Sequence, residues 1–82
     1  MNDSIARMEG PAVYRICVEG QLAADWYDRL EDMNITRLDS LDGQRKTVLV
    51  GRLPDQAALA GLLSTLYELH LPLLSVECLE VG

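Results

Sequence analysis

The side chains best suited to chemistry are few and widely separated in this sequence. His70 is the single histidine of the 82 residues, and Cys17 and Cys78 are the two cysteines. A structural zinc site needs clustered Cys or His ligands, usually in closely spaced pairs. No CxxC or comparable pair occurs in the chain, so the sequence predicts no metal site and no cofactor.

Nucleophilic catalysis needs a hydroxyl or thiol beside a base that activates it. The only imidazole belongs to His70, which stands two residues before Pro72, where a helix is expected to end. Histidine is one of the larger residues that tolerate the left-handed conformation of a helix C-cap. We therefore assign His70 to a helix end, and we predict no catalytic residue and no enzymatic activity.

The charge balance excludes further classes of function. The chain has 13 acidic and 7 basic residues and a net charge of −6, whereas nucleic-acid binding needs Lys and Arg to neutralise phosphates. Its apolar stretches are shorter than the roughly 18 residues of a membrane span. Residues 1–10 lack the basic start and apolar run of a signal peptide. We expect a cytoplasmic protein that contacts neither nucleic acid nor membrane.

The second half of the chain predicts a helix between two strands. The helical repeat consists of apolar residues at Leu59, Leu62, Leu63, Leu66 and Leu69. Asp55 stands where an N-cap belongs. Gly61 interrupts the pattern and indicates either close packing on a sheet or the approach of a ligand. Residues 47–50 and 73–79 are rich in aliphatic residues and predict the strands on either side.

The first half predicts a strand at 13–19, a helix at 23–33 and a strand at 35–41, the last ending at a turn at Asp42-Gly43. Residues 1–10 are expected to form a flexible tail, and 11–82 a single domain. With right-handed crossovers this order predicts an α+β, ferredoxin-like βαββαβ sandwich. Its four-stranded antiparallel sheet would have the strand order 4-1-3-2, with two helices on one face.

Such a sheet has a second face that no helix covers. We place five residues there as an interaction face: Arg15, Cys17, Leu49, Glu77 and Leu79. Arg15 and Glu77 are expected to pair across neighbouring strands. Cys78 should face the helices, on the opposite side from Cys17, so we expect no disulfide between them. A half-apolar exposed face is typical of an interaction surface.

Most of the chain, from Tyr14 to Val76, resembles a group of short bacterial proteins of unassigned function. The resemblance is carried by YRICVEGQL at residues 14–22, by Trp26 and by TVLVGRLPDQAALAGLLSTLYELHLPLLSV at residues 47–76. The most specific shared sequence pattern is DQAALxGLLxxLxxLxLPLLSV, which follows a strand that ends in glycine. The resemblance implies a small bacterial α+β protein and brings no active-site motif with it.

These observations favour a non-enzymatic interaction or regulatory module that forms a homodimer through its open face or an edge strand, and that can also bind another bacterial protein. A second hypothesis is a small-molecule sensor with its ligand at a dimer seam near Gly20, Gly51 or Asp55. A third is an enzyme of the dimeric α+β barrel kind, which would use His70, Asp55 or Tyr14.

Overall fold

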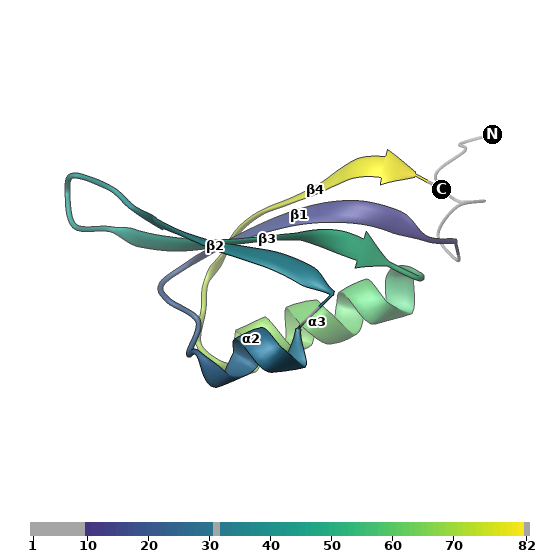
Figure 1. The fold of residues 1–82 in the computed structure, drawn as a ribbon, viewed down its shortest axis with the longest axis horizontal. Helices are drawn as coiled ribbons and strands as arrows, with labels where there is room; N and C mark the ends of the chain where they lie inside the picture. Colours follow the sequence, from purple (N-terminus) through teal and green to yellow (C-terminus); the bar gives the residue numbers. More distant parts are fainter. Residues whose placement is uncertain (1–9, 31, 82) are drawn as a thin grey trace.

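The computed structural model describes residues 10–30 and 32–81. Its elements are β1 (Ala12–Glu19), α2 (Asp25–Arg29), β2 (Met33–Asp39), β3 (Arg45–Leu53), α3 (Gln56–Glu68) and β4 (Leu73–Val81). Figure 1 shows both helices on the same face of the sheet. The predicted tail, residues 1–10, lies outside the described residues except for Gly10.

The four strands form one sheet in the order β2-β3-β1-β4, and every neighbouring pair is antiparallel. Read from the β4 edge, the same sheet runs β4, β1, β3, β2. The predicted α+β architecture, with a four-stranded antiparallel sheet and two helices, is confirmed. The edges of the sheet are β2 and β4.

The hydrophobic core lies between the sheet and α3. Alternate residues of β1 face the helices and are buried, namely Ala12, Tyr14, Ile16 and Val18. They contact the buried stripe of α3, which consists of Leu59, Leu62 and Leu66. The buried residues recur every second position in the strand and about every 3.6 positions in the helix, and together they form one apolar layer.

Both ends of α3 are stabilised by local hydrogen bonds. The Asp55 carboxylate accepts from the Ala58 amide at 2.8 Å, as the sequence predicted for an N-cap. At the other end His70 has φ 62°, so its predicted left-handed conformation is confirmed. The His70 amide donates to the Tyr67 carbonyl and the Leu71 amide to the Leu66 carbonyl, which is a Schellman motif.

The first helix and the two strands after it differ from the prediction. α2 spans only Asp25–Arg29, because Met33 belongs to β2 and is buried in the core. β3 continues through Gly51 instead of ending there. A Cβ atom at Gly51 would collide with the Met33 sulfur and lie 2.8 Å from the Asp32 carbonyl oxygen. Gly51 therefore permits the close approach of β2 rather than breaking a strand.

The β2–β3 hairpin extends well beyond the helices (Figure 1). Its turn lies at Asp42-Gly43, as predicted, but of these two residues only Gly43 has a positive φ, 87°. The Asp42 carboxylate accepts hydrogen bonds from the Ser40 hydroxyl and from the Gln44 amide. These two bonds, with that of Ser40 the larger influence, lower the pKa of Asp42 below its ordinary value.

Candidate functional site

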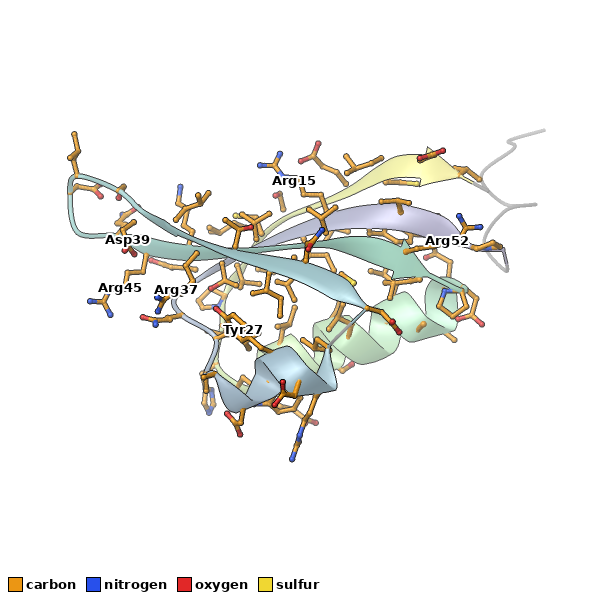
Figure 2. All side chains as sticks on the ribbon, in the orientation of Figure 1. Arg15, Tyr27, Arg37, Asp39, Arg45 and Arg52 are labelled. Carbon is orange, nitrogen blue, oxygen red and sulfur yellow. The ribbon has the colours of Figure 1, made fainter. Side chains whose placement is uncertain are left out.

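Three of the five predicted face residues lie together on the open face. Arg15 and Glu77 are opposite each other in β1 and β4, with Arg15 Nη1 3.4 Å from Glu77 Oε1. Cys17 is two residues further along β1 on the same face and is half-buried. Figure 2 shows Arg15 projecting from the side of the sheet away from the helices. The predicted pair is confirmed, but both side chains are about half exposed, so the contact contributes little to stability.

Leu49 does not lie on the open face, so that prediction is wrong. It is paired with Ile16, and both side chains are fully buried on the helix side of the sheet. Opposed residues of antiparallel strands share a face, and a shift of one residue exchanges the two faces. Residues 47–50 are β-branched or aliphatic on both sides, so their pattern does not indicate which set faces the core. The open face takes Val48 and Val50 from β3 instead.

Leu79 is exposed, as predicted, but it does not belong to the row that contains Arg15. It lies between Cys78 and Glu80 at a shift in the β1–β4 register, where no β1 residue is its partner. An extra residue of this kind interrupts the alternation of a strand. Leu79 is therefore an exposed residue of the sheet edge.

β4 is the strand that the helices leave uncovered. All nine of its residues are exposed. They include five large aliphatic side chains: Leu73, Leu74, Val76, Leu79 and Val81. Three of them, Leu73, Val76 and Val81, lie opposite buried residues of β1 and therefore on the helix side of the sheet, beyond the area that the helices cover. A long, exposed, apolar edge strand is a template for pairing with another chain. This edge is the strongest candidate for an interaction surface.

A groove of about 760 Å³ adjoins this edge, between the C-terminal half of α3 and the start of β4. Its walls are mostly apolar and include Leu63, Tyr67, Leu71 and Leu73. Tyr67 is 81 % exposed. Sequence reasoning missed Tyr67, which lies beside the buried stripe of α3. The available signal was the high aliphatic content of residues 73–81, in an edge strand of a sheet that only two helices cover.

A family model described as a domain of unknown function, DUF8691, matches residues 13–77. The chain belongs to the DUF8691 family. No curated protein and no solved structure matches it. The matched range begins in β1 and ends in β4, so the DUF8691 domain includes both helices, most of the sheet and the whole groove beside α3.

The loop residues expected to bind a small ligand are not brought together in the DUF8691 domain. The Gly20 amide donates to the Arg45 carbonyl at the start of β3. Gly51 and Asp55 lie at the other end of β3 and just beyond it. The close approach of β2 fills the space at Gly51, and the Asp55 carboxylate caps α3. These three positions form no common site.

The three residues of the enzyme hypothesis are also separated. Tyr14 is buried, and its hydroxyl contacts the Gln56 side chain in the first turn of α3, next to Asp55. His70 lies beyond the opposite end of α3, a helix of 13 residues and therefore roughly 20 Å long. The fold of the DUF8691 domain does not place His70 within reach of Tyr14 or Asp55.

Within residues 10–30 and 32–81, no three His, Cys, Asp or Glu side chains are grouped closely enough to hold a metal ion. In the same part of the chain, no helix has the length and apolar character needed to cross a membrane. Cys17 and Cys78 are both free thiols. The register places Cys78 opposite the core residue Tyr14, on the other side of the sheet from Cys17, as predicted.

Proposed function

We propose that this DUF8691 domain is a non-enzymatic interaction module that forms a homodimer through the free edge of β4. The observation that carries the proposal is that all nine residues of this strand are exposed, five of them with large aliphatic side chains. Pairing with a second strand would satisfy the free backbone groups of the edge and remove apolar surface from water.

The edge strand fits this role better than the open face. The centre of the open face contains Val48, which is already buried within the monomer, and the charged pair of Arg15 and Glu77. Docking there would remove water from two charges and would cover little additional aliphatic surface. At the β4 edge, by contrast, Val76 and Val81 are both exposed.

The experiment is to measure the solution mass by light scattering over a wide range of dilution, for the wild type and for Val76→Lys. We expect a wild-type dimer, and a monomer for Val76→Lys because a charge on an edge strand opposes pairing. Leu41→Lys is the matched control, since it makes the same change at a fully exposed residue of the distant hairpin turn. A wild-type monomer at every concentration would refute the proposal.

A second candidate function is the sensing of a small molecule at the dimer seam. The observation that favours it is the apolar groove of about 760 Å³ between α3 and the first residue of β4. The size and lining of this groove are those of ordinary ligand sites. A thermal-shift screen of amino acids and nucleotides tests the idea, with Tyr67→Ala as the variant expected to lose any stabilisation. No hit for the wild type would remove it.

We further propose that the topology is ferredoxin-like and that the protein acts in the bacterial cytoplasm. The strand order β2-β3-β1-β4 supports this topology, as does the placement of both helices on one face. The bacterial assignment rests on the resemblance of residues 14–76, and the cytoplasmic one on the two free thiols. An experimental structure with a left-handed crossover, or recovery of the protein from the periplasm, would contradict these assignments.

A further inference from the structure

We infer that a second copy of this chain docks on β4 as an antiparallel strand, with the two-fold axis at Val76. The two Val76 residues would then lie opposite each other, and the two sheets would join into one. The inference rests on the proposed self-association and adds the register of the seam to it.

The hydrogen bonding of β1 indicates which β4 residues have free backbone groups. The Glu19 amide donates to the Pro72 carbonyl, on the β4 side, at 2.8 Å. The Gly20 amide donates to the Arg45 carbonyl, on the β3 side, at 2.7 Å. The backbone N–H and C=O groups of successive residues point to opposite edges of a strand. Arg15 and Cys17 are an even number of residues from Glu19, so their backbone groups also form hydrogen bonds with β4.

The partners of Arg15 and Cys17 are Glu77 and Ser75, so these two β4 residues direct their backbone groups inward to β1. Val76 and Cys78 alternate with them, and their amide and carbonyl groups therefore point to the free edge. Residues 75–78 lie between the two register shifts of the β1–β4 ladder, so this stretch is regular. It is the part of the edge best suited to accept another strand.

The side chains on the open face distinguish the symmetric registers. An axis at Val76 places Glu77 of each copy opposite Ser75 of the other, where the hydroxyl can donate to the carboxylate. An axis at Glu77 places two carboxylates directly opposite each other, which destabilises a strand pair. The chain has a net charge of −6, so a register that separates the glutamates is favoured.

The neighbouring registers bring the regular stretch of β4 against its register shifts. An axis at Cys78 would place Glu77 opposite Leu79, and an axis at Ser75 would place Val76 opposite Leu74. Leu79 and Leu74 are the extra residues at these shifts, where the alternation of the strand is interrupted. Only the axis at Val76 combines an aliphatic pair at the centre with a polar pair on each side. The axis is perpendicular to the sheet, so both helix layers lie on the same side of the joined sheet, as they would in any symmetric antiparallel register.

Disulfide trapping tests the register. In a Cys17→Ser, Cys78→Ser background, Val76→Cys and Glu77→Cys are each exposed to a mild oxidant and compared on a non-reducing gel. With the axis at Val76, the two Cα atoms at position 76 would be about 5.5 Å apart, within the usual range for a disulfide. Residue 77 of each copy would lie opposite residue 75 of the other, so the two residues at position 77 would be two positions apart along the strand. They would be too far apart to form a disulfide.

We expect Val76→Cys to form covalent dimers at least tenfold faster than Glu77→Cys. Faster trapping of Glu77→Cys, or equal trapping of the two, overturns the register. The register is also overturned if light scattering shows a dimer but neither variant is trapped. In that case the proposed self-association would still hold. A wild-type monomer at all concentrations refutes both the register and the proposed function.

Glu77→Gln provides a second measurement that does not depend on engineered thiols. If the axis were at Glu77, removal of the two opposed charges would lower the dimer dissociation constant several-fold. With the axis at Val76 we expect no tightening, because the residue opposite is Ser75. Circular dichroism verifies that each variant is folded, and a tighter Glu77→Gln dimer would contradict the inference.

Discussion

Ile16 of β1 and Val76 of β4 lie directly opposite each other in the sheet, yet Ile16 is fully buried and Val76 is 36 % exposed. The two side chains point to the same side, where α3 covers β1 and leaves β4 open. The boundary between the core and the candidate interaction surface therefore passes between two adjacent strands. The following variants test the packing on either side of this boundary and the local structures that maintain it.

Leu49→Ala should lower the free energy of unfolding by about 3 kcal/mol, because it removes a fully buried side chain from the core. Leu79→Ala makes the same change at an exposed edge position and should alter that free energy by less than about 0.5 kcal/mol. Urea unfolding, at a protein concentration where the wild type is monomeric, measures both. Equal losses for the two variants would contradict the assigned register of β3.

Gly51 and Gly61 should respond to alanine in opposite directions. Gly51→Ala should destabilise the fold by about 1–3 kcal/mol, because the new methyl group collides with Met33. A methyl group at Gly61 would meet no atom of another element within 4 Å, so close packing on the sheet does not explain this glycine. Gly61→Ala should therefore raise the free energy of unfolding by up to about 1 kcal/mol. Thermal unfolding of the pair measures the contrast, and destabilisation by Gly61→Ala would show that the space is filled.

Asp55→Ala should lower the free energy of unfolding by about 1 kcal/mol, since it removes the acceptor for the Ala58 amide at the start of α3. Asp55→Asn is the matched control, because its side-chain oxygen can still accept this bond. Chemical unfolding followed by circular dichroism compares the two. If Asn were as damaging as Ala, the charge of the residue rather than its capping bond would be responsible.

The pKa of Asp42 should rise towards its ordinary value in Ser40→Ala, because the Ser40 hydroxyl is the main group that lowers it. A depressed carboxyl pKa stabilises the folded hairpin fully above the ordinary pKa of aspartate. This stabilisation is lost as the pH falls through the lower folded-state value. An NMR titration of the Asp42 side chain measures the shift in both proteins. Ser64→Ala, on the exposed side of α3, should leave the titration unchanged.

The sequence by itself determined the elements whose causes are local. The capping carboxylate of Asp55, the spacing of Leu59, Leu62 and Leu66, and the left-handed His70 before Leu71-Pro72 predicted α3 and its ends. Each depends on residues within about one helical turn, so a single chain segment contains the information. The turn at Asp42-Gly43 was predictable for the same reason.

Only the tertiary structure decided which faces and edges are covered. Whether Leu49 or Val48 faces the core depends on the register of β3 against β1, and a strand that is apolar on both sides does not specify it. Met33 was expected in the first helix, but it belongs to β2, where it packs over Gly51. The exposure of β4 depends on where α3 lies across the sheet, and no residue of β4 encodes that position. Burial is a property of the assembled layers, which is why the sequence left the open face and an edge strand as alternatives and did not show that every residue of β4 is exposed.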